Sequence, residues 1–188
     1  MSPRHDSRCR AGACNLRPDV PPANLTVRLA TIDDAAEIAA MSHDLIESGL
    51  GWTWTAARVA RNIRNPSTLT VVACAPERIA GFAIMYCSDE HAHLSLLAVR
   101  PEWQRAGLGR HLVAWLEESA LAAGIGTLRL ELRESNRAAS RFYARLGFAE
   151  VARVPAYYAG VEAAVRMSRD IRRGPTGPLP GIGRLLNG

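Results

Sequence analysis

The chain has 188 residues, 48% of them hydrophobic and 22% charged, which predicts one soluble globular domain. All 23 of its Lys and Arg residues are arginine, and this excludes mechanisms that use a lysine as Schiff-base former, general base or P-loop phosphate ligand. The formal net charge of +5 comes from the two ends, because residues 24–170 hold 16 arginines and 16 acidic residues, so no broad basic nucleic-acid face is predicted on the folded body.

Both ends of the chain have the composition of disordered tails. Residues 1–23 mix Arg, Pro, Gly and Ser without periodicity, and residues 172–188 are rich in Pro and Gly. The folded domain is therefore expected over residues 24–171. A nucleic-acid partner is expected, if at all, only through these basic tails.

The sequence predicts neither a membrane segment nor a metal site. No uncharged apolar run approaches the roughly 20 residues that span a bilayer, and the N-terminus lacks the apolar core of a signal peptide, so we expect a cytoplasmic protein. Cys9 and Cys14, with His5 nearby, have irregular spacing in a polar segment, which is typical of a tail rather than a zinc site. Cys74 and Cys87 lie in apolar runs, where buried free thiols are expected.

The first half of the domain begins with a strand over residues 25–30. Thr31 and Asp34 then form a capping-box pattern that predicts a helix ending at Gly49. A short linker with Trp52 and Trp54 precedes a second helix over residues 55–64. Three strands follow, at 68–75, 78–87 and 92–99, and the turn residues between them favour an antiparallel meander.

The second half changes to helical periodicity after Pro101. Leu108, Leu112, Leu116 or Trp115, and Ala120 share one face of a helix that stops at Gly124. A strand at 127–133 is followed by a helix that Asn136 caps and that ends at Gly147, with an apolar stripe of Ala139, Phe142, Tyr143 and Leu146. Strands at 149–154 and 163–169 complete the order βααβββαβαββ, an α/β fold with a mixed sheet flanked by helices.

The segment from Leu97 to Leu112 carries the strongest chemical signal. A strand ends there, and a loop with Gly107 and Gly109 enters a helix. The first turn of a helix offers unpaired backbone N–H groups and a positive dipole end, so this loop is a candidate anion site. Arg105 and Arg110 would add charge for phosphate oxygens.

Three blocks of sequence resemble the GNAT superfamily of N-acetyltransferases. They are the Gln-Arg-Ala-Gly-Leu-Gly of residues 104–109, the Glu-Leu-Arg-Glu-Ser-Asn of residues 131–136 and the Arg-Phe-Tyr-Ala-Arg-Leu-Gly-Phe of residues 141–148. Together with the strand that precedes them, Leu94 to Val99, they stand in the order of that superfamily over about 60 residues, and within it the chain is most similar to the bacterial ribosomal-protein-alanine N-acetyltransferases.

The resemblance implies a mostly antiparallel sheet that splays between its fourth and fifth strands, 92–99 and 127–133. Acetyl-CoA would lie in that gap as co-substrate, without a metal. The backbone of the strand at 92–99 would pair with the pantetheine arm and polarise the thioester carbonyl. The cofactor-binding residues would be Leu97, Ala98, Val99, Arg105, Ala106, Gly107, Leu108, Gly109, Arg110 and Asn136.

The same resemblance assigns Glu131 as the base and Tyr143 as the acid of acetyl transfer to an amine. Each residue also has an ordinary structural interpretation. Glu131 alternates with apolar residues between Arg129 and Arg133, as on a polar strand face with ion pairs. Tyr143 shares a helix with apolar residues, as a core aromatic would.

The acceptor site is less defined by the sequence. Trp52, Trp54 and the pair Tyr157–Tyr158 are candidates to line an amine pocket, with packing or surface positions as the alternative. His91 and His93 are surface histidines or an alternative base. Leu96 stands where the ribosomal subgroup usually has Asn.

The resemblance, with Glu131 as a modest base, favours acetylation of the α-amine of a protein or peptide. An α-amine has a pKa of about 7.7–8.0, so a modest base suffices near neutral pH. The alternatives are an enzyme that acetylates a small amine such as a polyamine, amino acid or aminoglycoside, and a non-catalytic module that senses acyl-CoA or associates with RNA or ribosomes.

Overall fold

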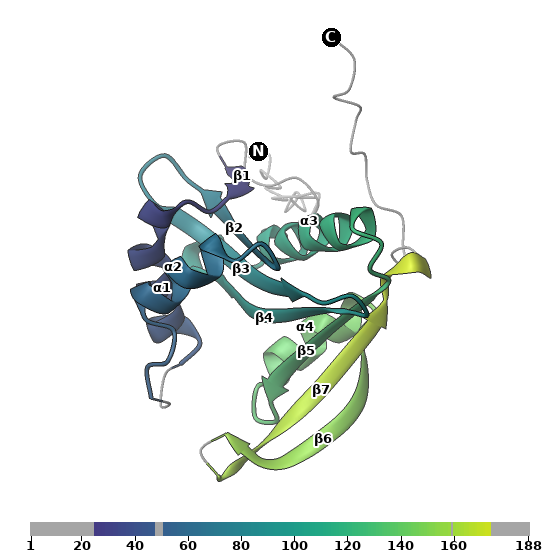
Figure 1. Ribbon diagram of the computed structural model, residues 1–188. Helices are drawn as coiled ribbons and strands as arrows, with labels where there is room; N and C mark the ends of the chain where they lie inside the picture. Colours follow the sequence, from purple (N-terminus) through teal and green to yellow (C-terminus); the bar gives the residue numbers. More distant parts are fainter. Residues whose placement is uncertain (1–24, 48–50, 159, 174–188) are drawn as a thin grey trace, which may run out of the picture.

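The computed structural model describes residues 25–47, 51–158 and 160–173. They form a seven-stranded sheet with helices on both faces (Figure 1). The strand order is β1-β2-β3-β4-β5-β7-β6, antiparallel throughout except for the parallel pair β4 and β5. The elements are β1 (Thr26–Leu29), α1 (Ala35–Leu45), α2 (Ala56–Arg64), β2 (Thr68–Cys74), β3 (Ile79–Cys87), β4 (Ala92–Val99), α3 (Leu108–Ala122), β5 (Thr127–Arg133), α4 (Arg137–Arg145), β6 (Ala149–Tyr158) and β7 (Glu162–Asp170).

The predicted order βααβββαβαββ is confirmed, and the differences lie at element ends. Helix α1 ends at Leu45, before the expected stop at Gly49, which lies outside the described residues. Strand β6 continues beyond residue 154 to Tyr158, because it pairs with β7 along the whole hairpin. The expected tails lie outside the described residues apart from Arg172 and Arg173, which belong to a short 3-10 turn.

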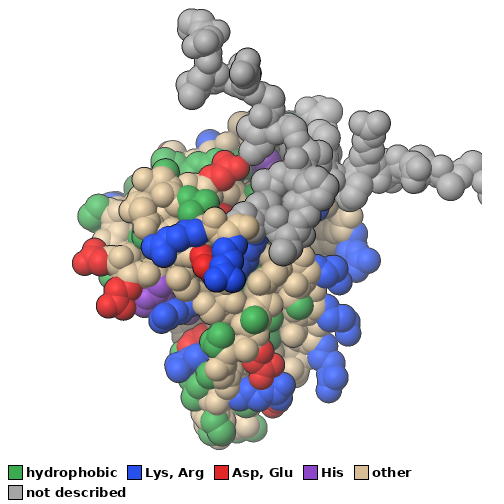
Figure 2. All heavy atoms as spheres, turned by 90° about the vertical axis from the view of Figure 1, so that its right-hand side faces the viewer, with side chains coloured by type: hydrophobic (Ala, Val, Ile, Leu, Met, Phe, Trp, Pro, Cys, Tyr) green, Lys and Arg blue, Asp and Glu red, His purple; other side chains and the backbone are tan. Residues whose placement is uncertain are grey.

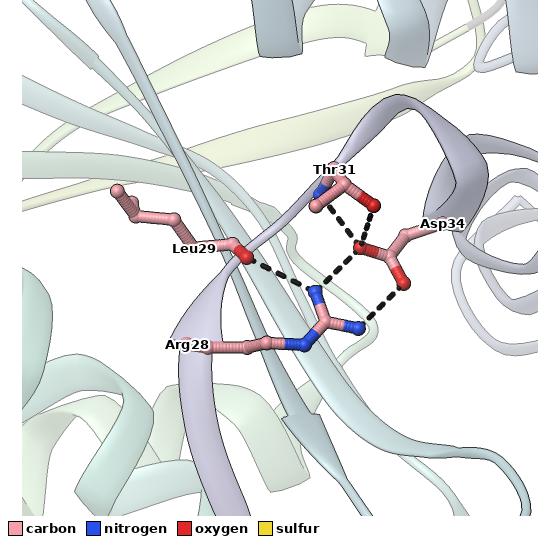
Figure 3. Close-up of polar contacts among 4 residues, drawn as sticks. All are labelled: Arg28, Leu29, Thr31 and Asp34. Atoms are coloured by element: carbon pink, nitrogen blue, oxygen red, sulfur yellow. Dashed lines mark hydrogen bonds and ion pairs between the residues drawn. The ribbon is translucent and has the colours of Figure 1, made fainter.

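The expected capping box joins β1 to the start of the first helix (Figure 3). The Thr31 backbone N–H and hydroxyl both donate to Asp34 Oδ2, at 2.6 and 3.1 Å. The Arg28 guanidinium donates to both carboxylate oxygens, at 2.7 and 2.9 Å, and these bonds hold the pKa of Asp34 below its ordinary value. A 3-10 turn at Ile32–Asp34 therefore leads directly into α1.

Each face of the sheet has its own hydrophobic core. One core contains α1 and α2 side chains such as Ile38 and Val59, packed on Phe82 of β3. The other contains α3 and α4 side chains, including Leu112 and Tyr143. Of the two candidates for the buried face of α3, Leu116 is fully buried and Trp115 only packs against the core edge. The free thiols Cys74 and Cys87 are half-buried rather than buried, and burial raises the pKa of both.

A β-bulge at Ser95 interrupts β4. On β3, Met85 pairs with Leu94 and Ile84 pairs with Leu96, so within the β3–β4 ladder Ser95 is the extra residue. Leu94 packs in the α3–α4 core, whereas Leu96 packs in the α1–α2 core. In a regular strand these two side chains would share a face, so the bulge reverses the facing of the rest of β4.

Strands β4 and β5 separate at this bulge. Their parallel pairing extends from Ala92 opposite Leu128 to Leu94 opposite Leu130, and within the described residues it stops there. Beyond this point β5 turns away with β7 and β6 (Figure 1). The predicted splay between the fourth and fifth strands is thus confirmed. The edge of β4 from Leu96 to Val99 is left facing the gap.

Helix α3 packs closely against the end of β4 because β3 carries Gly81 there. A Cβ atom at Gly81 would lie 3.0 Å from the Ala98 carbonyl oxygen and 3.2 Å from Leu112 Cδ1. The close approach fixes α3 beside the gap. Within the described residues, every helix is too short or too polar to cross a membrane.

Candidate active site

Glu131 lies on β5 beside the point where β4 and β5 separate. Its neighbours Leu130 and Leu132 pack in the α3–α4 core, so the alternation of the strand directs Glu131 to the other face of the sheet. Arg129 and Arg133 share that face with it. Glu131 is thus a carboxylate at the mouth of the gap, between two arginines of its own strand.

Arg166 of β7 is opposite Glu131 in the antiparallel ladder and forms an ion pair with it. The Arg166 Nε–H donates to Glu131 Oε1 at 2.6 Å, and the Glu131 side chain is 19% exposed. Burial raises the pKa of Glu131, but hydrogen bonds from Tyr157 and Arg166 and the charges of Arg166 and His93 lower it more, so the net shift is downward. The carboxylate is therefore ionised at neutral pH.

His93 and Tyr157 complete the surroundings of Glu131. His93 pairs with Arg129 across β4 and β5, which makes it a diagonal neighbour of Glu131 on the same face. Burial lowers the pKa of His93, against the opposing effect of Glu131. The hydrogen bond to Glu131 and burial both raise the pKa of Tyr157. Of the two alternatives for His93, a surface position does not hold, because His93 is half-buried beside Glu131, and Tyr157 lies near the end of β6.

Tyr143 lies on the opposite side of the sheet from Glu131. It is 8% exposed and belongs to the α3–α4 core, where its ring makes edge contacts with Phe142 and Phe148. Burial raises the pKa of the Tyr143 hydroxyl, so the group is protonated at neutral pH. The two expected catalytic residues therefore come from β5 and from α4, the helix that follows it, and lie on opposite faces of the sheet.

The glycine loop before α3 has the backbone of an anion-binding turn. Arg105 and Gly107 have positive φ angles of 64° and 83°, and Gly107 is the N-cap of α3. The first N–H groups of α3 belong to Leu108, Gly109 and Arg110, which by position have no acceptor within the helix. A Cβ atom at Gly109 would lie 3.4 Å from the Phe142 ring, which places the loop against α4.

Asn136 has a structural role as the N-cap of α4. Its side-chain oxygen accepts a hydrogen bond from the Ala139 N–H at 3.0 Å, as the sequence predicts. The side chain is otherwise exposed at the end of the loop that follows β5. Its expected contact with a cofactor stays a prediction.

The two tryptophans contact α1 and α2 rather than Glu131. The Trp52 ring packs edge-on against His43 with centroids 5.2 Å apart, and the Arg58 guanidinium lies 4.3 Å from the Trp54 ring centre. Tyr157 and Tyr158 instead stack edge-on with each other in the β6–β7 hairpin, with Arg133 near the Tyr158 ring. The expected aromatic group is therefore split into two clusters, and the hairpin cluster adjoins Glu131.

Glu47, which the sequence pattern does not reveal, fixes the tryptophan segment to α1. The residue is 5% exposed, and its carboxylate accepts hydrogen bonds from the Thr53 N–H and hydroxyl at 2.7 and 2.6 Å. The Trp54 N–H and the Ser42 hydroxyl also donate to it. Burial raises the pKa of Glu47, but these hydrogen bonds together lower it by more than burial raises it, so the net shift is downward.

Arg166 is the other residue that sequence reasoning missed. Its place opposite Glu131 depends on the β5–β7 register, which is set by the hairpin with β6 and cannot be counted from the sequence. The one available signal was the alternation of Arg166 with Val165 and Met167, which marks a polar strand face. The ion-pair interpretation of Glu131 is thus confirmed in the structure.

Comparison with known proteins gives one family. Residues 38–148 match the family model described as acetyltransferase (GNAT) family. A [ribosomal protein bS18]-alanine N-acetyltransferase of Salmonella typhimurium is 41% identical over 100 residues, which cover 52% of this chain and 68% of that protein.

Solved structures have the same architecture. The ribosomal-protein-S18-alanine N-acetyltransferase of Escherichia coli is 32% identical, with a TM-score of 0.65 over 78% of this chain and 94% of that one. An N-acetyltransferase from Thermoplasma acidophilum, solved in complex with coenzyme A, shares the fold at 20% identity, with a TM-score of 0.66 over 78% of this chain and 98% of that one.

Replacement of Glu47 tests whether this carboxylate holds the tryptophan segment in place. We expect Glu47→Ala to lower the free energy of unfolding by about 2 kcal/mol at pH 7, because hydrogen bonds to a charged group are lost. The exposed Glu118→Ala on α3 serves as the matched control, with a change below about 0.5 kcal/mol. Urea denaturation followed by tryptophan fluorescence measures both.

The pH dependence of the Glu47 effect has a defined sign. Because the folded pKa of Glu47 is lowered, its contribution is complete above the unfolded pKa of about 4.3 and is lost as the pH falls through the folded value. The difference between wild type and Glu47→Ala should therefore shrink on acidification. An equal difference at pH 7 and pH 3 would contradict the assignment.

Proposed function

From the premise that this chain belongs to the acetyltransferase (GNAT) family and is an acetyl-CoA-dependent N-acetyltransferase, we propose that it acetylates the N-terminal α-amine of a protein. The observation that carries the proposal is the ionised Glu131 on β5 beside the gap between β4 and β5, with the protonated Tyr143 in the core on the other face of the sheet. The Salmonella relative, whose name specifies a protein alanine as acceptor, supports this acceptor class.

The residues around the gap fit the cofactor. The free edge of β4 at Leu97, Ala98 and Val99 would pair with an extended pantetheine arm, and the glycine loop from Arg105 to Arg110 would hold the pyrophosphate. Asn136 would contribute a further contact to the cofactor arm. Acetyl-CoA supplies an acetyl group activated as a thioester. The N–H groups of β4 would stabilise negative charge that develops on its carbonyl oxygen.

Glu131 would act as the base that removes a proton from the acceptor ammonium. Its lowered pKa makes Glu131 a weak base, but the carboxylate is fully ionised at neutral pH. Because an α-amine has a pKa of about 7.7–8.0, a weak base is enough to remove its proton near neutral pH. Arg166 would position the carboxylate through its ion pair. On the other face, Tyr143 holds a proton at its hydroxyl and would serve as the acid.

The charges beside Glu131 favour an α-amine over a polyamine. Arg129 and Arg133 flank Glu131 on its own strand, and Arg166 lies opposite it. A small polycation would meet the guanidinium groups of Arg129, Arg133 and Arg166 there, of which Arg133 also pairs with Glu162. A peptide N-terminus brings a single positive charge, which the carboxylate can accept.

The proposed roles predict a specific pattern of kinetic defects. Glu131→Gln and Tyr143→Phe should each lower kcat by about 10²–10⁴-fold, with little change in the Kd for acetyl-CoA, because each removes one proton transfer. Arg166→Gln breaks the same ion pair but keeps the carboxylate, so kcat should stay within about tenfold of wild type. Equal losses in Glu131→Gln and Arg166→Gln would show that Glu131 is only a structural ion-pair partner.

A glycine substitution tests the proposed pyrophosphate loop. Gly107→Ala should raise the Kd for CoA about tenfold, equivalent to about 1.4 kcal/mol. The reason is that alanine disfavours the positive φ with which Gly107 orients the backbone of the loop. Gly124→Ala is the matched control: φ is 81° there, the site is open, and it follows the other end of α3. Both variants should lose similar stability, and isothermal titration with CoA should separate them. Equal CoA affinities would refute the loop assignment.

An acceptor panel tests the proposed reaction. At pH 7.5 peptides that begin with Ala, Ser or Met should be acetylated with kcat/KM about 100-fold above a polyamine or an internal lysine, because far more of an α-amine is unprotonated. The same peptides with a blocked N-terminus are the control and should not react. Mass spectrometry identifies the modified nitrogen. Preferential acetylation of spermidine or an aminoglycoside would establish the small-amine alternative instead.

A further inference from the structure

The outer surface of α4 carries three arginines in a line. Arg137, Arg141 and Arg145 are spaced four residues apart, so they share one side of the helix, and all three are exposed. The opposite side holds Tyr143 and its apolar neighbours, which pack in the core. These three residues are called the α4 arginine row.

Within the described residues, ion pairs to carboxylates neutralise some arginines of the domain but not the α4 arginine row, nor Arg61 and Arg64 of α2. Ion pairs to carboxylates involve Arg28, Arg78, Arg100, Arg133, Arg153, Arg166 and Arg169. Within the part of the chain that the structure describes, no carboxylate pairs with the α4 arginine row. Figure 2 shows a column of basic side chains, without acidic ones between them, along the edge that corresponds to the rear of Figure 1, where α4 lies. A domain with balanced total charge thus has a concentrated basic surface.

We propose that the α4 arginine row docks this enzyme onto the phosphate backbone of RNA. Guanidinium groups bind phosphate oxygens in pairs of hydrogen bonds, and no carboxylate among the described residues competes for those on α4. The row covers nine residues, so its ends lie about 12 Å apart along the helix and its three guanidinium groups can reach successive phosphates of one strand. The docking is independent of base sequence because the row offers charge rather than a base-reading groove.

RNA is the partner that the proposed function favours, and the inference rests on that function. The name of the Salmonella relative specifies an alanine of a ribosomal protein as the acceptor, and ribosomal proteins are assembled with RNA. Contact between the row and RNA would raise the local concentration of the acceptor N-terminus at Glu131 without any contact to the acceptor itself. The row would therefore select acceptors that are presented beside RNA.

The cofactor is the competing source of phosphate. Gly109 of the glycine loop lies against Phe142 of α4, so the row is near the proposed pyrophosphate site. That loop has its own basic residues, Arg105 and Arg110, which face the cofactor in the proposal above. The experiment must distinguish RNA from CoA as the ligand of the row.

The test uses the full chain and a fluorescein-labelled 20-nucleotide oligouridine. Binding is followed by anisotropy between 50 and 200 mM KCl for wild type, the triple variant Arg137→Gln/Arg141→Gln/Arg145→Gln, and the pair Arg137→Gln/Arg145→Gln. Arg61→Gln/Arg64→Gln on α2 is the charge-matched control for the pair, since both residues are exposed at the far face of the sheet. The arginines outside the described residues contribute equally to every variant.

The triple variant should weaken RNA binding and its salt dependence together. Three lost phosphate contacts should reduce the slope of log K against log salt by about 2, with a loss of affinity of about 20-fold or more at 50 mM KCl. The paired α4 variant should lose more than the α2 control. The KM for acetyl-CoA and kcat on a free Ala-starting peptide should not change in any of them.

Three results would overturn the inference. Equal losses in the α2 and α4 pairs would indicate general charge attraction. A severalfold rise in the KM for acetyl-CoA in the triple variant would assign the row to the cofactor. Competition by polyglutamate as strong as that by unlabelled oligouridine would indicate an acidic protein partner. If no variant or wild type acetylates the peptide while the RNA result holds, the proposed function fails and the RNA-binding surface stands.

Discussion

The bulge at Ser95 is the constraint on which the site depends. The extra residue in β4 makes Leu94 and Leu96 face opposite sides of the sheet. The pairing of β4 with β5 ends at Leu94, next to the bulge. If β4 and β5 paired along their whole length, no gap would remain between them. The bulge instead leaves the edge of β4 from Leu96 to Val99 facing a gap whose opposite side carries Glu131. The close packing of α3 on Gly81 then brings the glycine loop to the end of that edge.

The charges follow the same geometry. Carboxylates that the fold needs are held by hydrogen bonds, as Asp34 is by Arg28 and Glu47 is by Thr53, and the pKa of each is lowered. Glu131 is restrained in the same way by Arg166 and Tyr157, yet it lies at the open gap. A carboxylate that is ionised but a weak base matches an α-amine better than a lysine side chain.

Local patterns made most of the fold predictable. The capping box at Thr31, the N-cap at Asn136 and the stop at Gly124 each rest on chemistry within a few residues, and the structure has all three. Register is different, because Glu131 pairs with Arg166, which lies 35 residues later in the chain and beyond the β6–β7 turn. The bulge at Ser95 and the carboxylate cradle of Glu47 also depend on tertiary contacts, and no periodicity in the sequence marks them.

Amide hydrogen exchange with and without CoA tests the central claim most directly, because that claim concerns the unpaired backbone edge of β4 beside the gap. The account predicts that CoA slows exchange at Leu97 and Val99 of β4 and at Leu108–Arg110 of α3, where N–H groups face the gap or the loop. Exchange in β1 and β2, on the far side of the sheet, should not change. Protection confined to the β6–β7 hairpin, or no protection in β4, would contradict it.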